Sequence, residues 1–380
     1  MVHQRPLRLA MLTELTRKNG SSRVVCYQYE AHLRQAGIDV HFFPPSSVAL
    51  YELFYERVKH PRWLVLLLKA IYWYLLVLPW RLWQILQAPR FDVIFLQRGL
   101  LKHDASPLLE VLLWAVAKKL FGRPLIYALD DAQYLFAPSS YFHIRFKLAD
   151  WVYTGNPEIA EYARIFKPCV KVMESVVDPD YYYPPKQHIE HKPVVIGWAG
   201  WLADNSGGPL RLIKNAITRV SQMYPVVLEV VSNCPWEVDI PDANLVNRRW
   251  SLQKEVENLA HFDIGIMPLE DKPFNRAKEG YKLKQYMAMG LPVVCSPVGK
   301  NKQIVRDGVT GFFATSEDKW VDRLTQLIQS STLRAQMGAA GRAYIREHYS
   351  LAKSGPQMAS WLWQVHREKG KVDPIVKAEQ

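Results

Sequence analysis

The sequence has few of the features that assign a chain to a class at once. It contains 4 cysteines among 380 residues, Cys26, Cys169, Cys234 and Cys295, and no C-x-x-C pair. Neither a disulfide framework nor a zinc site is therefore expected, and we interpret the four as reduced core thiols of a cytoplasmic protein. The N-terminus shows no apolar segment of signal-peptide type, and the chain contains no internal repeat or low-complexity tract.

The composition is that of a globular protein with a basic first third. Hydrophobic residues make up 49% and charged residues 22%, and the length favours two domains. The formal net charge is +12, and residues 1–125 hold 17 Lys and Arg against 8 Asp and Glu. This third is expected to meet an anionic partner. Basic and aromatic motifs do not interleave as in nucleic-acid-binding proteins, so no nucleic-acid partner is predicted.

Apolar runs of strand length alternate with helical segments along the chain, which predicts an α/β fold with parallel sheets. The first domain is expected over residues 1–185 and the second over residues 186–345. An irregular segment, 181–192, is the predicted linker. A helix of about residues 352–369, within a C-terminal segment 346–380, is expected to pack back on the surface.

Residues 63–78, WLVLLLKAIYWYLLVL, are almost all apolar. Sixteen helical residues reach roughly 24 Å, less than the ~30 Å hydrocarbon core, and Pro79 is expected to break the run. The tryptophans and flanking cations are typical of a helix in the headgroup region. We therefore predict that segment 59–86 binds an anionic membrane surface. Burial in the first domain and a dimer contact are the alternatives.

Two adjacent carboxylates, Asp130 and Asp131, follow the predicted strand 124–129. Ligands of doubly wound sheets bind outside the carboxyl ends of the strands, so these side chains are well placed to accept protons or hydroxyl hydrogen bonds. Alternatively, they cap the next helix or pair with His143 and Arg145.

Two loops with small residues open predicted helices. Gly20 begins the run GSSR before a helix of about residues 24–35, and Gly200 and Trp201 follow the strand 193–198. Backbone N–H groups in such loops can cradle an anion at a helix N-terminus. A tight loop with no ligand is the alternative for Gly20. The second loop is neither G-x-G-x-x-G nor a Walker motif, so it is a weak signal by itself.

The densest cationic stretch lies within residues 263–301, which predict a buried strand, a polar loop, a helix of about 280–289 and a second buried strand. Four cations fall within nine residues: Arg276, Lys278, Lys282 and Lys284. This concentration predicts a phosphorylated ligand.

The same block resembles the family 4 glycosyltransferases, retaining enzymes with the GT-B fold of two facing Rossmann-like, doubly wound domains. The resemblance covers nearly the whole chain and is closest to a subfamily with a Gly-Lys…Lys-Leu-Leu-Gln-Tyr-Met-Ala pattern. The matching positions are Gly197, Trp198, Gly200, Trp250, Ser251, 263–269, Lys278, Lys282, Leu283, 285–288 and 290–299, with 130–132 and 174–178 in the first domain.

The resemblance implies that the second domain binds a nucleotide-diphosphate sugar and that no metal or other cofactor is required. Lys278 and Lys282 are expected to stabilise the leaving diphosphate, together with backbone N–H groups near Gly200. Asp130 or Asp131 is expected to orient the acceptor hydroxyl. The other candidates for donor binding are Gly20, Trp201, Trp250, Arg276, Glu279 and Gln285.

The chain departs from the family at two patterns. The Arg and Lys pair that many relatives carry after the domain-opening glycines is not evident, so Arg276, Lys278 and Lys282 are expected to neutralise the diphosphate instead. The family often carries two glutamates eight positions apart, where this sequence has Ala277 and Gln285. Gln285 can still hydrogen-bond ribose hydroxyls, Ala277 cannot, and Glu279 is a possible substitute.

Two functional hypotheses follow. The first is a glycosyltransferase that acts on a saccharide or lipid-linked acceptor in cell-surface polysaccharide, lipopolysaccharide or glycolipid synthesis. It would be cytoplasmic and peripherally associated with the inner face of the cell membrane. The second is a catalytically silent GT-B protein that serves as a binding or scaffold module at the membrane.

Overall fold

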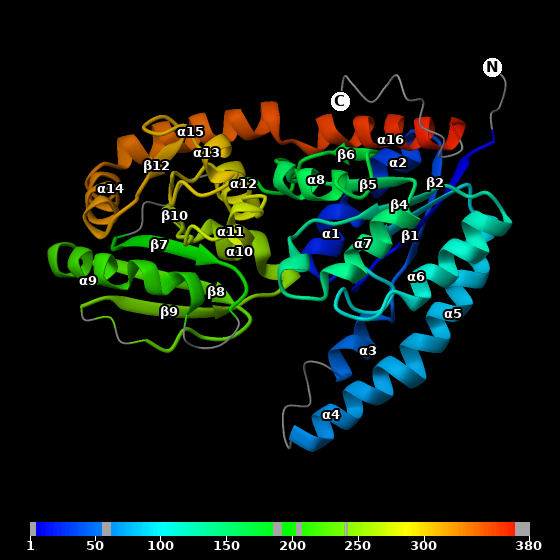
Figure 1. The fold of residues 1–380 in the computed structure, drawn as a ribbon. Helices are drawn as coiled ribbons and strands as arrows, with labels where there is room; N and C mark the ends of the chain where they lie inside the picture. The colour runs from blue at the N-terminus through cyan, green and yellow to red at the C-terminus, as the bar shows by residue number, and fades with distance from the viewer. Residues whose placement is uncertain are drawn as a thin grey trace. The chain divides into compact units, whose positions relative to one another are not determined.

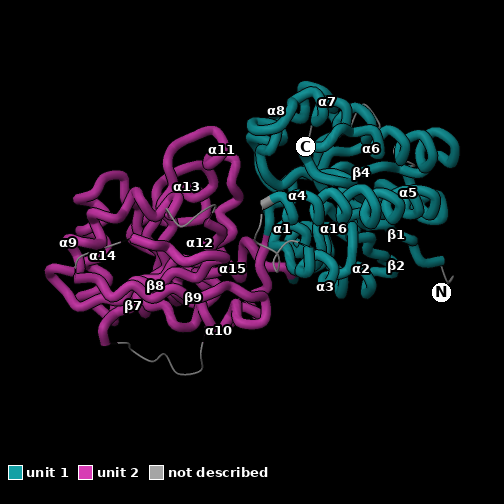
Figure 2. Tube along the Cα trace, turned by 90° about the horizontal axis from the view of Figure 1, so that it is seen from below, with its two compact units in different colours: residues 1–175, 352–380 teal, residues 176–351 magenta. Residues whose placement is uncertain are grey.

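The structure is a computed structural model, and it describes residues 5–54, 62–184, 192–202, 207–238, 240 and 242–368. Two compact units make up the chain (Figure 1, Figure 2): unit 1 comprises Met1–Ser175 and Ala352–Gln380, and unit 2 comprises Val176–Leu351. Each unit contains a six-stranded sheet whose strands all pair in parallel. The predicted α/β class with two parallel sheets is confirmed.

The sheet of unit 1 has the order β2-β1-β3-β4-β5-β6, so the strand order reverses between β1 and β3. Its central strands are buried along their whole length because helices cover both faces. The strands are β1 (Leu7–Leu12), β2 (Ile38–Phe43), β3 (Val93–Gln97), β4 (Leu125–Ala128), β5 (Trp151–Thr154) and β6 (Val170–Val172).

Helices connect these strands. The helix expected over residues 24–35 is instead divided in two by a 3-10 turn, η1 (Tyr27–Tyr29). The helices of unit 1 are α1 (Gly20–Val25), α2 (Glu30–Gln35), α3 (Val48–Glu52), α4 (Arg62–Ala70), α5 (Leu78–Gln87), α6 (Leu108–Leu113), α7 (Ser139–Leu148), α8 (Pro157–Arg164) and α16 (Leu351–Arg367), with π-helical segments η3 (Ile71–Val77) and η5 (Trp114–Leu120).

The prediction that Pro79 ends the apolar helix is wrong. Segments α4, η3 and α5 form one continuous helix that runs through Pro79, and the apolar span Trp63–Arg90 is 28 residues long. Pro79 lies in the first turn of α5, directly after π-helical η3. Wider π-type turns accommodate the missing N–H of a proline, so the chain continues as a helix. By length and composition this helix could cross a membrane.

The sheet of unit 2 has the order β12-β11-β10-β7-β8-β9, and its strand order reverses between β7 and β10. The strands are β7 (Val194–Ala199), β8 (Val226–Ser232), β9 (Asn244–Arg249), β10 (Ile264–Met267), β11 (Val293–Cys295) and β12 (Gly311–Phe313). The helices are α9 (Lys214–Met223), α10 (Glu255–Ala260), α11 (Pro273–Arg276), α12 (Tyr281–Ala288), α13 (Asn301–Ile304), α14 (Glu317–Gln329) and α15 (Ser331–His348). Ligand-binding loops of doubly wound sheets gather where the strand order reverses.

The C-terminal helix α16 packs back, as predicted, and its contacts are with unit 1. Trp361 is buried and meets the ring of Trp151 edge-on, with 6.0 Å between centroids. The Trp363 indole N–H donates to the carbonyl of Ala36 at 3.0 Å.

The chain changes unit at residues 175/176 and 351/352, earlier and later than the predicted 185 and 345. Part of the predicted linker, residues 185–191, lies outside the described residues. The earlier change has a physical reason, since Val177 forms a parallel β-bridge with Ser350 inside unit 2.

Candidate functional site

Helix α12 brings Lys282 to the carboxyl end of β7. The Lys282 ammonium nitrogen lies 4.1 Å from the centroid of the Trp198 ring. A Cβ added at Gly200 would lie 2.1 Å from that nitrogen, so glycine leaves the room that the lysine occupies. One turn later, the Tyr286 hydroxyl accepts the N–H of Ala199 at 2.7 Å and fixes the helix to the strand end. The structure thus brings the predicted residues Gly200 and Lys282 together.

The ammonium group of Lys282 is electrostatically uncompensated. Burial, helped by the positive charge of Lys278, lowers the pKa of Lys282 to about 7. No carboxylate among the described residues opposes that shift. A bound anion would favour the charged form and restore the proton. The site is therefore suited to a group with negative charge, such as a diphosphate.

Two more of the predicted residues, Gln285 and Trp250, belong to one hydrogen-bonded chain. The Gln285 Nε2 donates to the Tyr182 hydroxyl at 2.8 Å. That hydroxyl donates to Glu255 at 2.7 Å, and the indole N–H of Trp250 donates to the other oxygen of Glu255 at 3.3 Å. Tyr182 and Glu255 were not identified from the sequence. They fix the amide of Gln285 as a donor toward the tyrosine.

This direction of hydrogen bonding predicts that the family's glutamate cannot simply be restored. A carboxylate at position 285 would face a hydroxyl whose proton already serves Glu255, in a buried setting. We expect Gln285→Glu to lower the free energy of unfolding by about 1–3 kcal/mol in a urea titration. The exposed Gln253→Glu serves as the control. Unchanged stability of Gln285→Glu would contradict the assigned direction.

The remaining predicted donor residues have different surroundings. Arg276 forms an exposed ion pair with Asp271 at 2.6 Å, so its charge is already partly neutralised. Trp201 is 77% exposed, directly after Gly200. Glu279 is half-buried just before α12, and Ala277 is buried and offers no polar group.

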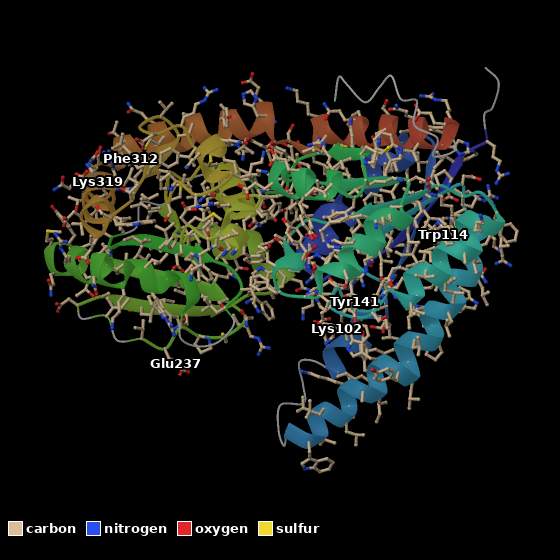
Figure 3. All side chains as sticks on the ribbon, viewed as in Figure 1. Lys102, Trp114, Tyr141, Glu237, Phe312 and Lys319 are labelled. Atoms are coloured by element: carbon tan, nitrogen blue, oxygen red, sulfur yellow. The ribbon has the colours of Figure 1, made fainter. Side chains whose placement is uncertain are left out.

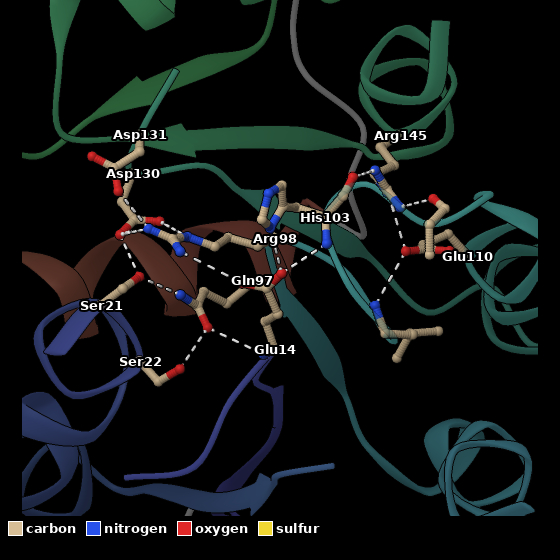
Figure 4. Close-up of polar contacts among 12 residues, drawn as sticks. Glu14, Ser21, Ser22, Gln97, Arg98, His103, Glu110, Asp130, Asp131 and Arg145 are labelled. Atoms are coloured by element: carbon tan, nitrogen blue, oxygen red, sulfur yellow. Dashed lines mark hydrogen bonds and ion pairs between the residues drawn. The ribbon is translucent and has the colours of Figure 1, made fainter. Parts of the chain in front are cut away.

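In unit 1, both predicted carboxylates bind a single arginine, Arg98 (Figure 4). Its guanidinium contacts Asp130 at 2.6 and 2.9 Å and Asp131 at 2.6 Å. Arg98 directly follows β3 and has φ = 60°, a conformation that costs a non-glycine residue energy and aims this side chain at the carboxylates. The structure therefore brings Asp130 and Asp131 to one cluster at the carboxyl edge of the sheet.

The alternative partners predicted for the two aspartates, His143 and Arg145, form other contacts. His143 shares a hydrogen bond with the Tyr162 hydroxyl at 2.7 Å, and Arg145 pairs with Glu110 at 3.1 Å. The helices that follow, the 3-10 turn η6 (Gln133–Leu135) and α7, have no side-chain cap. Arg98 contacts both carboxylates.

The loop at Gly20 also leads to Asp130. The Ser21 hydroxyl donates to the Asp130 carboxylate, and the Gln97 amide donates to the Ser21 oxygen at 2.6 Å. An anion cradled at the start of α1 would therefore meet a carboxylate. This arrangement favours the alternative reading of Gly20, a tight loop that needs small residues.

A third carboxylate, Glu14, holds the other side of the cluster. It accepts the backbone N–H of His103 at 2.7 Å and contacts its Nδ1 at 2.8 Å, while Arg98 lies 3.5 Å away. Burial alone would raise the pKa of Glu14, but the His103 hydrogen bonds and the charge of Arg98 outweigh it and lower the pKa. Burial likewise opposes the charge of Arg98, but the three carboxylates raise its pKa above the ordinary value. Glu14 and Arg98 are therefore both held in their charged forms.

Arg98 and Glu14 were not predicted as site residues, although a signal existed. Each directly follows, or nearly follows, a buried strand, as Asp130 does. Applying the strand-end rule to all strands would have found both. As for metals, the described part of the chain contains no group of three His, Cys, Asp or Glu side chains placed to hold an ion.

Comparison with known proteins supports a specific family for unit 2. Residues 193–330 match the model of the family described as glycosyl transferases group 1. This match includes β7, α12 and the lysine site. No curated protein matches the chain.

Solved structures match nearly the whole chain. Anabaena Alr3699/HepE in complex with UDP is 15% identical with a TM-score of 0.61, over 94% of this chain and 100% of that one. Sucrose-phosphate synthase from Thermosynechococcus elongatus is 13% identical with a TM-score of 0.65, over 95% and 99%. The apo lipopolysaccharide outer core galactosyltransferase WaaB is 13% identical with a TM-score of 0.56, over 94% and 100%.

At these identities the structural likeness concerns the fold, and the family match adds the activity. Residues 193–330 therefore match the group 1 glycosyl transferases, and the chain is a glycosyltransferase with the GT-B fold.

Proposed function

We propose that this enzyme transfers a sugar, with retention, from a nucleotide-diphosphate sugar to a saccharide or lipid-linked acceptor. The observation that carries the proposal is the uncompensated ammonium of Lys282, which lies beside Gly200 at the carboxyl end of β7. Negative charge develops on the diphosphate as it leaves, and a fixed cation at that point lowers the barrier without a metal.

The other residues of unit 2 have supporting roles in this proposal. Lys278 adds positive charge next to Lys282, and the backbone after Gly200 approaches the phosphates. The chain from Gln285 to Trp250 positions groups for the ribose and base. Arg276 is available to the diphosphate only when it leaves Asp271.

In unit 1 we propose that Asp130 or Asp131 orients the acceptor hydroxyl by accepting its hydrogen bond. The guanidinium of Arg98 contacts both carboxylates and holds them in place. Of the two, Asp131 is the more exposed, with 36% of its side chain accessible against 15% for Asp130, and is the better candidate for direct contact.

A panel of sugar nucleotides tests the proposal. UDP-, GDP-, dTDP- and ADP-sugars are screened by thermal shift and by release of nucleoside diphosphate, with saccharide and lipid-linked acceptors. Because HepE has been solved with UDP-glucose, that donor comes first. We expect one donor to raise the melting temperature and to turn over. No binding and no turnover would refute the proposal, and binding without turnover would favour the silent scaffold.

We also propose that the protein is cytoplasmic, associates with the inner membrane face through segment 59–86, and acts in cell-surface polysaccharide, lipopolysaccharide or glycolipid synthesis. Outward side chains line α4 and α5 (Figure 3). Of the 18-residue apolar stretch within Trp63–Arg90, only 11% is buried. Burial in unit 1, one of the alternatives, is therefore wrong for most of this helix. Residues 55–61 lie outside the described part.

The helix is nevertheless tied to unit 1 by several hydrogen-bonding side chains, among them Trp80, Arg81 and Gln84. Arg81 of α5 is fully buried and donates to the carbonyls of Phe43, Leu100 and Thr13. This anchor favours a helix that lies along the membrane surface over one that crosses it.

A further inference from the structure

A second apolar segment, residues 108–121, is exposed next to α5. Leu108 at the start of α6 and Leu120 at the end of η5 are each 73% exposed, and Phe121 is 57% exposed. The opposite face of the same helix is buried through Leu109 and Leu113. Large apolar side chains exposed along one helical segment mark a candidate interaction surface.

The two segments lie at the same end of unit 1. Helix α5 packs against both α6 and η5, and Figure 1 and Figure 2 both show α6 beside α5. Each helix buries one face in unit 1 and leaves the other outside, where α5 carries Leu82 and Leu86. Neighbouring outward faces of this kind can meet a single apolar environment.

The charges of the residues around these helices favour an anionic partner. Residues 62–123 contain nine Lys and Arg against three Asp and Glu. Among the bases, Arg98, Lys118 and Arg123 are in ion pairs, and so are two of the acids, Asp92 and Glu110. Lys119 is exposed beside Leu120. The stacked indoles of Trp80 and Trp83, 4.6 Å apart, add the aromatic groups typical of a headgroup layer.

A second copy of the chain is the less favourable occupant. A self-complementary contact through this face would bring two cationic surfaces together, which costs free energy. An anionic lipid layer supplies the opposite charge and an apolar interior at once.

We propose that α6, η5 and Phe121 form, together with α5, one docking surface for anionic phospholipids. Unit 1 would then be held at the membrane by two segments. The proposal deepens the membrane association proposed above and rests on it.

Full-length protein is tested by co-sedimentation with phosphatidylcholine vesicles, with and without phosphatidylglycerol. We expect binding only to the anionic vesicles, weakened by salt. The double variant Leu120→Glu/Phe121→Glu is expected to bind at least tenfold more weakly. The matched control is Ile165→Glu, which changes an equally exposed apolar residue of unit 1, at 72%, away from these helices and should bind like the wild type. Urea titration checks that both variants are folded.

The outcomes separate the possibilities. If Leu86→Glu weakens vesicle binding and the double variant does not, the second segment plays no part and this inference is wrong. If the double variant instead dissociates an oligomer of a protein that does not bind vesicles, a second copy is the occupant and the inference is wrong. Nucleoside diphosphate release with a water-soluble acceptor should be equal in all variants, so failure of the docking surface is distinct from failure of the proposed transfer.

Discussion

Replacing Lys282 by alanine is expected to abolish nearly all transfer while leaving a folded protein. The loss of one preorganised contact to a developing anion typically costs about 2.7–4 kcal/mol in the barrier, or roughly 10²–10³ in kcat. Folding should not suffer, since the variant removes a desolvated cation with no compensating carboxylate among the described residues. Steady-state kinetics and urea titration measure the two effects separately.

Lys272→Ala is the matched control, because Lys272 forms an exposed ion pair with Glu270 and should affect neither property appreciably. A Lys282→Ala enzyme that turns over at the wild-type rate would show that the leaving diphosphate is stabilised elsewhere.

The lowered pKa of Lys282 adds an expected pH dependence of donor binding. In the free protein the side chain loses its proton as the pH rises through about 7. A bound diphosphate favours the protonated form, so binding above pH 7 takes up a proton and affinity falls as the pH rises. Calorimetry at pH 8 in two buffers of different ionisation enthalpy should show this uptake in the wild type and not in Lys282→Ala. Equal proton uptake in both would assign the titration to another group.

The second large effect is expected from Arg98→Met. Three carboxylates would lose their common counter-ion in a largely buried cluster, and breaking a buried ion pair in this way costs about 3–5 kcal/mol of stability. Methionine is unbranched at Cβ, like arginine, so the backbone at φ = 60° is equally strained in both proteins. The exposed Arg219→Met, which removes ion pairs with Glu317 and Asp318, is expected to leave stability nearly unchanged.

The effect of Arg98 should depend on pH with a definite sign. The folded-state pKa of Glu14 is lowered, so its contribution is complete above its ordinary pKa and is lost as the pH falls through the lowered value. Without Arg98 this stabilisation decreases. The gap between variant and wild type is therefore largest at neutral pH and narrows in acid. Urea titrations at pH 7 and at about pH 3, below the ordinary glutamate pKa, test this, and a gap that widens in acid would show that packing dominates.

The parts of the fold that depend on local pattern were predictable. Alternating apolar and polar runs located the strands of both sheets, and glycine stops such as Gly290 located helix ends. The path of the helix through Pro79 was not predictable from local pattern. The preference of proline to end a helix was outweighed by π-helical turns and by packing on unit 1.

The candidate site also has a part that the sequence predicted and a part that it did not. Lys282 and Gly200 lie in loops and helices that follow a known pattern, and the structure places them in contact. The partner of Asp130 could not be read from spacing, since Arg98 is 32 residues away and only the pairing of β3 with β4 brings the two strand ends together. The register of β3 against β4 determines which arginine reaches Asp130, and register is a property of the assembled sheet.

The packing of α16 on unit 1 affects the order in which the two units fold during translation. On the ribosome, a domain encoded by one uninterrupted stretch can close as soon as that stretch has emerged. Unit 2 satisfies this condition, whereas unit 1 must wait with the surface around Trp151 uncovered until residues 351–367 follow. Unit 1 is thus translated first but completes its folding last. A chaperone would be most needed while unit 1 still lacks α16.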